Sequence, residues 1–326
     1  MGSPARRVAI TGASGYCAAG LLDRLEAEDG IEAVLAIDVR PPRAERGAKV
    51  VFHRHDVSEP MGDLLRDYAI DSVVHLAYLM RPGHDRTASR KVNVGGTANV
   101  LKAVEQAGVQ RLLYLSSSTV YGAHHDNPPL LTEDAPLRPV KGFQYSEGKV
   151  RSEEALAELV QRSPQVTACV LRACPVMGPG ADNFVSRALS RPFLVAVRGC
   201  DPPMQFLHED DLADAMLLCL LGNAPGVYNL AGEGGIRWSD MARSRGRRLI
   251  SLPAAMLYGL TDATWALRLQ GDSPACGLDF IRHRWSVSTE KIERDLGFAP
   301  RYSSAEAWNA FAHRTRDPMN GAAPRS

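Results

Sequence analysis

Apolar and polar residues follow two different patterns along the first half of the chain. Short, nearly continuous apolar runs predict buried strands at residues 6–12, 31–38, 49–56, 71–77, 110–118 and 165–173. Between them, apolar residues at helical spacing predict helices at 15–28, 60–69, 88–108 and 143–162. Strands that alternate with helices in this way predict an α/β fold, with a doubly wound parallel sheet covered on both faces.

The pattern is looser after residue 174. Short apolar pieces at 192–197 and 226–232 alternate with helical segments at 209–222, 253–269, 288–298 and 303–314. We therefore expect a larger domain over residues 1–174 and a smaller α/β lobe over residues 175–316, packed against the carboxyl edge of the sheet. Residues 317–326 are expected to be a disordered tail.

The composition mainly argues against particular classes of protein and site. The 326 residues are 45% hydrophobic with a formal net charge of +1, so charge gives no argument for a nucleic-acid or membrane partner. No apolar run reaches the length of a membrane span, and the start lacks the apolar core of a signal peptide, so we expect a cytoplasmic protein. The six cysteines form no C-x-x-C pair and predict reduced thiols rather than a metal site.

A glycine-rich stretch, T-G-A-S-G-Y at residues 11–16, joins the first strand to the first helix. In such a turn, backbone N–H groups approach a pyrophosphate and the helix N-terminus adds partial positive charge. Gly12 and Gly15 supply the turn and the close approach, and Ala18 lies where only a small side chain is needed. The alternative is a tight turn that binds nothing, and this stretch by itself does not decide between them.

An acidic residue ends the second strand, at Asp38. A carboxylate there accepts hydrogen bonds from both hydroxyls of an adenosine ribose, which favours NAD because a 2′-phosphate would meet like charge. Arg40 and Arg43 follow closely and are able to pair with such a phosphate, so NADP stays open as an alternative. Asp56, after the third strand, is expected to reach the adenine edge.

Candidate catalytic residues occur in two places. Serines 116–118 lie at the end of a strand, which is the ligand-facing end of an open α/β sheet. Tyr145 and Lys149 are four residues apart near the start of a helix, and therefore on one face. A tyrosine with its usual pKa of about 10 is a poor base, but a neighbouring ammonium and a cationic nicotinamide favour the phenolate. It can then exchange a proton with a substrate hydroxyl or carbonyl while hydride moves.

The chain resembles the extended short-chain dehydrogenase/reductase family, in its NAD-dependent epimerase/dehydratase branch. The resemblance covers nearly the whole chain and keeps the family's order and spacing. Its motifs are TGASGYCA at 11–18, the acid at 38, VVHLA at 73–77, VNVGGT at 92–97, SSSTVYG at 116–122, YSEGK at 145–149, VMGPG at 176–180 and FLHEDDLADA at 206–215.

The resemblance implies roles for particular residues. Tyr145 would be the acid/base, Lys149 would lower its pKa and bind the nicotinamide ribose, and Ser117 would hydrogen-bond the reacting oxygen. Asn93 would hold the cofactor or a relay water, or else be a helix-surface amide. Besides Tyr145 and Lys149, the implied cofactor site consists of Gly12, Ser14, Gly15, Tyr16, Cys17, Asp38, Asp56, Val57, Leu76, Ala77, Asn93 and Val176.

Departures from the family pattern bear on the reaction. Family dehydratases carry Thr-Asp-Glu where this chain has Ser-Ser-Thr at 117–119, and elimination of water needs that extra acid and base. Pro175 replaces an asparagine, and Met204-Gln205 an arginine, that commonly grip nucleotide sugars. These changes favour a less charged substrate, while Arg191 and Arg198 keep the sugar alternative open.

The sequence therefore predicts a Rossmann-type, NAD(P)-binding oxidoreductase, with the catalytic residues in the larger domain and the substrate bound mainly by the smaller lobe. It would transfer hydride between nicotinamide and a secondary alcohol or ketone of a small molecule. The alternatives are an NAD-dependent sugar epimerase and a non-catalytic cofactor-binding regulator. The resemblance also implies a homodimer through the helices at 86–107 and 143–162. His75, His208, Asp210 and Asp211 are assigned to the fold rather than to a metal, and His84, His124 and His125 to loops.

Overall fold

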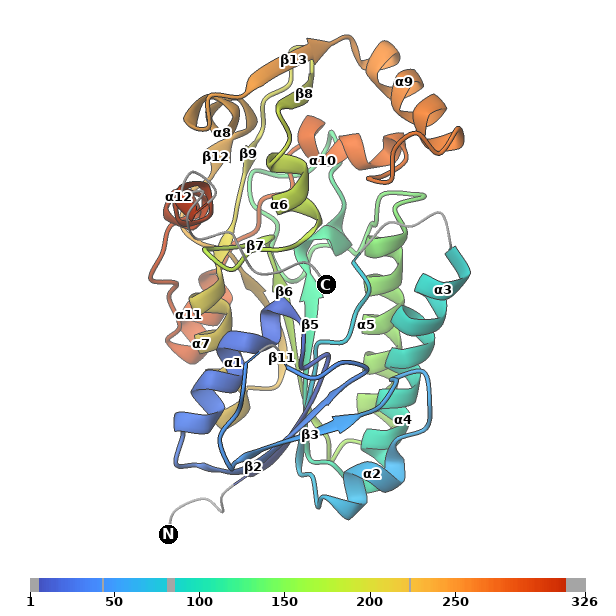
Figure 1. Cartoon of the computed structure of the whole chain (residues 1–326), viewed down its shortest axis with the longest axis vertical. Coiled ribbons are helices and arrows are strands. Elements are labelled where there is room, and N and C mark those ends of the chain that lie inside the picture. The colour runs from blue at the N-terminus through green and yellow to red at the C-terminus, as the bar shows by residue number, and fades with distance from the viewer. Residues whose placement is uncertain (1–5, 43, 81–85, 223, 315–326) are drawn as a thin grey trace.

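A single parallel sheet of seven strands organises the protein (Figure 1). The structure, a computed structural model, describes residues 6–42, 44–80, 86–222 and 224–314. The strand order is β11-β6-β5-β4-β1-β2-β3. The strands are β1 (Arg6–Thr11), β2 (Ile31–Asp38), β3 (Val50–Arg54), β4 (Ser72–His75), β5 (Arg111–Ser117), β6 (Thr167–Ala173) and β11 (Gly226–Leu230). This is the order of a Rossmann sheet with one added strand, so the predicted fold class is confirmed.

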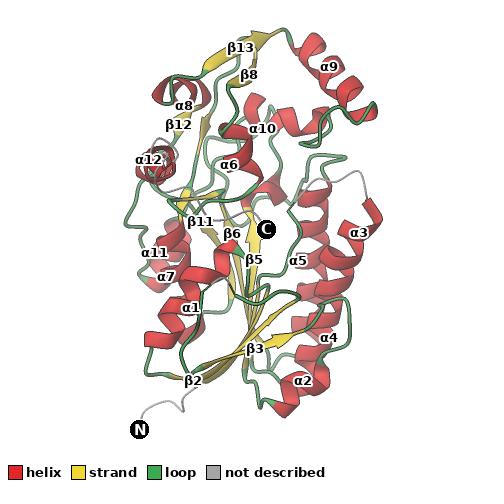
Figure 2. Ribbon diagram, viewed as in Figure 1, coloured by secondary structure: helices red, strands yellow, loops and turns green. Residues whose placement is uncertain are grey.

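Helices cover both faces of the sheet (Figure 2). Because side chains alternate along a strand, Val8 and Ile10 of β1 face one helical layer while Ala9 faces the other. The first layer holds α1 (Tyr16–Ala27), α7 (Glu209–Leu221) and α11 (Glu290–Leu296); the second holds α2 (Gly62–Asp67), α4 (Thr97–Ala107) and α5 (Gln144–Arg162). Both faces are therefore buried, which explains the nearly continuous apolar runs of the central strands.

A second lobe lies beyond the carboxyl ends of the strands (Figure 1). Three short strand pairs form it: β7 (Val176–Met177) with β10 (Leu207–His208), β8 (Phe193–Val197) with β13 (Arg248–Leu252), and β9 (Pro203–Met204) with β12 (Ile236–Arg237). Its helices are α6 (Phe184–Leu189), α8 (Trp238–Ser244), α9 (Ala254–Ala266), α10 (Asp279–Arg282) and α12 (Ser304–Arg314). Trp308, fully buried, packs among the apolar residues of this lobe.

The domain boundary at residue 174 stays a prediction. The main sheet and its helical layers include elements from both sides of that boundary. Strand β11 pairs with β6, and α7 packs against α1, although both follow residue 174. The expected tail at 317–326 lies outside the described residues. No helix in the described part of the chain is long and apolar enough to cross a membrane.

The predicted helix at 88–108 is not regular. It consists of α3 (Arg86–Arg90), a π-helical turn (Lys91–Gly96) and α4. The buried side chain of Asn93 hydrogen-bonds to the backbone of Leu79, which ties the helix to the segment after β4. Gly95 and Gly96 follow, and glycine has a low helix propensity, so both features favour an irregular turn here. The outward faces of α4 and α5 carry charged residues such as Glu105 and Arg162, and the homodimer remains a prediction that rests on the resemblance.

A buried ion pair fastens α5 to the sheet. Arg172 of β6 and Glu153 of α5 approach to 2.7 Å, and each side chain is only 6% exposed. Arg172 also donates to the hydroxyl of Tyr121 at 2.7 Å, and Ser116 of β5 donates to the same Glu153 carboxylate. The helix that carries Tyr145 and Lys149 is thus held in register with β5 and β6.

Removing one partner of this pair should be more damaging than removing both. Arg172→Met leaves the Glu153 carboxylate buried without a counter-charge, so we expect the free energy of unfolding to fall by about 3–5 kcal/mol. The double variant Arg172→Met/Glu153→Met should recover more than half of that loss in urea denaturation. A double variant as unstable as the single one would contradict the account.

Candidate active site

The glycine-rich loop touches the end of β4. Gly12 has a φ of +73°, and a Cβ atom there would lie 2.6 Å from the backbone nitrogen of Ala77. The Gly12 N–H donates to the carbonyl of Ile37 at 2.9 Å, which joins the loop to the end of β2 as well. Gly12 is therefore required for both its backbone conformation and the close approach.

The start of α1 is open to a ligand. Its N-cap residue, Gly15, provides no side-chain hydrogen bond, and no acidic residue lies in the first turn. The carboxylate of Asp38 accepts from the backbone N–H of Ser14 at 3.1 Å and from that of Arg40 at 3.1 Å. The structure therefore brings together the loop and the acid that the sequence predicted to bind pyrophosphate and ribose. Uncapped N–H groups and the helix dipole suit an anion at this point.

The next two predicted cofactor residues follow β3, the strand that pairs with β2. Asp56 accepts from the N–H of Ser58 at 2.8 Å, and chiefly this bond lowers the pKa of its carboxyl. Val57 is buried against Gly96, where an added Cβ would lie 2.7 Å from a Val57 methyl. Asp56 thus stabilises its own turn, and Val57 holds the end of the π-helical turn.

Tyr16 and Val176 lie where two loops meet. Glu209 accepts from the N–H of Gly180 at 3.0 Å with both carboxylate oxygens, and a Cβ at Gly180 would lie 3.0 Å from the ring of Tyr16. The backbone carbonyl of Val176, in β7, accepts from the side-chain amide of Asn183 at 2.7 Å. Glu209 therefore fastens the loop after β7 to the start of α1. It had not been singled out, although it is the first acid of the FLHEDDLADA motif.

The serine cluster separates into three environments. Ser117 accepts from the hydroxyl of Thr119 at 3.0 Å and lies against the phenol of Tyr145. Ser116 donates to Glu153, and Ser118 is fully buried. Of the three, Ser117 is the serine that the fold places beside Tyr145, at the end of β5.

Tyr145 and Lys149 occupy the first two turns of α5. Burial raises the pKa of Tyr145 to about 12, and the hydrogen bond with Ser117 acts in the opposite direction. The Lys149 amine donates to the carbonyl of Leu115 at 2.6 Å. Burial lowers its pKa to about 7, while nearby Glu153 acts to raise it. Both groups are therefore held far from their usual behaviour in water, which is typical of functional sites.

Two further residues contact this pair. Burial raises the pKa of Cys17 to about 11, and Lys149 acts against this rise, so the thiol of α1 is close enough to the amine to feel its charge. Tyr78 donates its hydroxyl to the backbone carbonyl of Tyr145 at 3.1 Å. Tyr78 had been missed, and its position directly after Leu76 and Ala77 was the available signal.

Asn93 holds backbone rather than facing solvent. Its side chain accepts from the N–H of Leu79 at 2.7 Å and donates to the carbonyl of the same residue at 3.0 Å. With 6% exposure, the helix-surface alternative is wrong. The segment after β4 is thereby fixed over the start of α5, and a contact of Asn93 with the cofactor stays a prediction.

The histidines agree with the assignment to the fold. His75 is buried between the hydroxyls of Thr11 at 2.7 Å and Thr97 at 3.0 Å. His208 caps α7 by accepting from the N–H of Asp210 at 3.2 Å. Within the described residues no cluster of three or more histidine, cysteine or acidic side chains is arranged to hold a metal. Arg43 and His84 lie outside the described residues.

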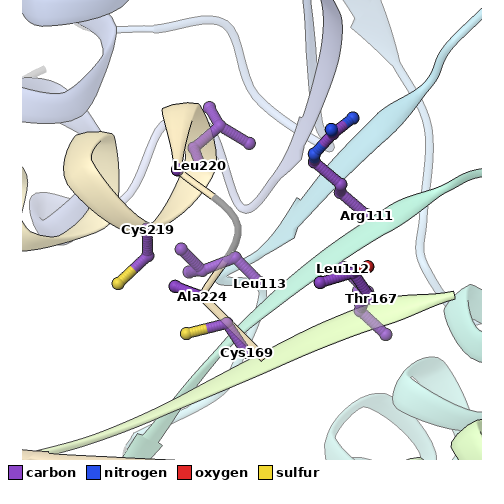
Figure 3. Close-up of a pocket in the computed structure, with 9 residues that line it drawn as sticks. Arg111, Leu112, Leu113, Thr167, Cys169, Cys219, Leu220 and Ala224 are labelled. Atoms are coloured by element: carbon purple, nitrogen blue, oxygen red, sulfur yellow. The ribbon is translucent and has the colours of Figure 1, made fainter. Parts of the chain in front are cut away.

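A small cavity lies at the opposite end of the sheet (Figure 3). Its volume is about 10 Å³, room for about one water molecule. Arg111 and Thr167, the first residues of β5 and β6, line it together with Cys169 and Cys219. It is a full strand length from Ser117, so it takes no part in the candidate active site.

Sequence comparison gives one family and several relatives. The model of the "NAD dependent epimerase/dehydratase family" matches residues 8–232, well over half of the chain. An uncharacterized protein of Mycobacterium tuberculosis is 26% identical over 315 residues, which cover 93% of this chain and 82% of that protein. UDP-glucuronic acid decarboxylase 4 of Arabidopsis thaliana is 29% identical over 259 residues, 73% of this chain and 56% of the plant protein.

Solved structures share the architecture. The UDP-glucose 4-epimerase of Thermotoga maritima, solved with UDP-glucose, has a TM-score of 0.74 at 18% identity, covering 96% of this chain and 100% of that one. MoeE5 in complex with UDP-glucuronic acid and NAD has a TM-score of 0.74 at 24% identity, covering 95% and 99%. At these identities the likeness establishes the fold.

Lys149 should give stability a pH dependence that a substitution can isolate. Its pKa is about 7 in the folded protein against an ordinary 10.5. Between pH 7 and 10 the unfolded chain therefore holds more protons than the folded one, and the free energy of unfolding rises with pH. Relative to Lys149→Met, the wild type should gain up to about 1.4 kcal/mol per pH unit across this range.

Urea denaturation at several pH values measures this difference, because titrations shared by both proteins cancel. Lys102→Met, on the exposed side of α4, is the matched control and should run parallel to the wild type. Parallel curves for Lys149→Met as well would show that its amine titrates normally.

Proposed function

Because the chain belongs to the NAD dependent epimerase/dehydratase family, we propose that it is an NAD-dependent oxidoreductase in which Tyr145 is the acid/base. The substrate is a small molecule with a secondary alcohol or a ketone. The observation that carries the proposal is the convergence of Ser117, Tyr145 and Lys149 at the carboxyl ends of the strands, beside the glycine-rich loop.

The residues present fit a dinucleotide. The uncapped start of α1 suits the pyrophosphate, and Gly12 leaves no room for a side chain where the backbone must approach it. Asp38, beside the Ser14 N–H, suits a ribose diol and favours NAD over NADP. When bound, NAD supplies the site that accepts or returns hydride.

The protein's own groups move the proton. Tyr145 takes the hydroxyl proton of an alcohol or returns one to a carbonyl, and Ser117 hydrogen-bonds the same substrate oxygen. The Ser117 oxygen already accepts from Thr119, which leaves its own hydrogen to donate. The amine of Lys149 lies 6.0 Å from the centroid of the Tyr145 ring, and its protonated form would stabilise the phenolate and so offset the effect of burial on Tyr145.

Polar groups at the predicted sugar-binding positions are already paired. Gln205 accepts from the N–H of Val287 at 2.7 Å and donates to its carbonyl at 3.2 Å, and Met204 is buried. Pro175 has no N–H to offer, and Arg191 is paired with Asp272. These contacts support a substrate with less charge than a nucleotide diphosphate sugar.

An epimerase is the second candidate, favoured by the family and by the epimerases that share the fold. It would use the same residues, with hydride leaving and returning in one turnover. A net change in reduced nicotinamide during incubation with candidate substrates indicates a dehydrogenase, and isomerisation with retained cofactor indicates an epimerase. Dehydration is disfavoured, because positions 118 and 119 provide hydroxyls rather than the acid and base it needs.

Tyr145→Phe should abolish turnover while leaving NAD bound. Loss of the proton-transferring hydroxyl should lower kcat by about 10²–10⁴-fold, since general acid–base catalysis contributes that much. Calorimetry should give an NAD affinity within a few-fold of the wild type. Tyr258→Phe, on α9, is the control and should keep full activity. Unchanged turnover in Tyr145→Phe would refute the mechanism.

Asp38→Asn should weaken NAD selectivity. Replacing a charged acceptor by a neutral amide should raise the Kd for NAD by about tenfold or more and lower the Kd for NADP, because charged hydrogen bonds are the stronger ones. Asp63→Asn, at an exposed pair with Arg66, should change neither value. If wild type and Asp38→Asn bind NAD equally, Asp38 does not contact the ribose.

A further inference from the structure

Tyr78 contacts both proposed catalytic residues of α5. The amine of Lys149 lies 3.9 Å from the centroid of the Tyr78 ring. The rings of Tyr78 and Tyr145 meet edge to face at 5.3 Å, and the Tyr78 hydroxyl donates to the Tyr145 carbonyl at 3.1 Å. One side chain from the segment that follows β4 therefore joins the two residues.

We propose that Tyr78 is a positioning residue: its ring face holds the ammonium of Lys149, and its hydroxyl holds the backbone of Tyr145. The inference deepens the proposed function and rests on it, because it assumes that Tyr145 and Lys149 act on substrate and cofactor.

The amine of Lys149 has few other partners. An ammonium has three hydrogens to donate, and in the described part of the chain the amine makes one hydrogen bond, to Leu115. The ring of Tyr114 lies 4.7 Å from the amine and that of Tyr145 6.0 Å. Aromatic faces thus surround this buried amine, and the Tyr78 ring is the nearest of them.

Among the described residues that act on the Lys149 amine, none is an unpaired anion that could stabilise its charge. From α1, Cys17 faces the amine as a neutral thiol, since burial raises its pKa. From β4, His75 is neutral, since burial lowers its pKa to about 3 and Lys149 acts in the same direction. Glu153, one turn further along α5, acts to raise the pKa of Lys149, but its carboxylate is already paired with Arg172. Burial raises the pKa values of the phenols beside the amine, so these groups are neutral before cofactor and substrate bind.

The surrounding structure is shaped to accept the Tyr78 phenol. A Cβ atom at Gly148 would lie 2.3 Å from the Tyr78 hydroxyl oxygen, so the helix admits this side chain only because residue 148 is glycine. The two bonds between Asn93 and the backbone of Leu79 fix the next residue in place. Helix α5 and the π-helical turn thus determine where the ring lies.

The ring and the hydroxyl are separable by substitution. Tyr78→Phe keeps the ring and removes the hydroxyl. A trifluorinated phenylalanine at position 78 keeps the shape but removes the negative potential of the ring face. Tyr78→Leu removes the ring. Tyr258→Leu is the matched control, because Tyr258 also pairs with a cation, Arg282, and with an acid, but on α9.

The decisive readout is the titration of isotope-labelled Lys149 by NMR, assigned with Lys149→Met and recorded without cofactor or substrate. We expect the Lys149 pKa to be similar in wild type and Tyr78→Phe. With the fluorinated ring and with leucine it should be lower by about one pH unit, a tenfold change in the protonation constant. Tyr258→Leu should leave it unchanged. An equal pKa with the phenylalanine and fluorinated rings would overturn the role of the ring, even if Tyr78→Leu fails to fold.

The hydroxyl is tested by turnover. Tyr78→Phe should lower kcat several-fold with an unchanged KM for the cofactor, because only the first turn of α5 is loosened. Unchanged kcat would overturn the role of the hydroxyl. The titration needs no turnover, so failure of the proposed function, seen as activity that survives Tyr145→Phe, is distinguishable from failure of this inference.

Discussion

Helix α5 carries two ionisable side chains into the interior, and the pairing of one of them with an arginine of β6 determines where the helix lies. Lys149 and Glu153 are one turn apart and are 4% and 6% exposed. The Glu153 carboxylate binds Arg172 of β6. Breaking such a buried pair is costly, since the remaining charge has neither water nor a counter-charge. The helix therefore cannot slide along the sheet without losing this interaction.

The same constraint places the start of α5 at the carboxyl end of β5. Consecutive residues of that strand contact residues of the helix that are one turn apart. The Leu115 carbonyl accepts from Lys149, and Ser116 donates to Glu153. Ser117, the last residue of β5, then lies against Tyr145. The proposed proton-transfer group is thus located by contacts one and two turns further along the helix. Tyr78, in the segment after β4, adds a hydrogen bond to the Tyr145 carbonyl. The glycine-rich loop packs against the backbone of the same segment, at Ala77.

Local sequence patterns predicted the parts of this arrangement that depend on burial and spacing. The Rossmann sheet followed from apolar runs, and the one-face placement of Tyr145 and Lys149 from their spacing of four. The π-helical turn within the helix predicted at 88–108 did not follow from the pattern, because it depends on a hydrogen bond between Asn93 and Leu79, fourteen residues away. Strand β11 was likewise read as part of the lobe, because a short apolar run shows that it is buried but not which sheet edge it joins.

Long-range polar contacts also bear on the proposed preference for a substrate with little charge. Gln205 is occupied by the backbone of Val287, and Asn183 caps α6 while donating to Val176. A side chain whose donors and acceptors are already paired gains little by turning to a ligand, since it must first give up those bonds. Under the proposed function, recognition would then rest on the hydroxyls at the end of β5 and on shape, as expected for a neutral substrate recognised at its reacting oxygen.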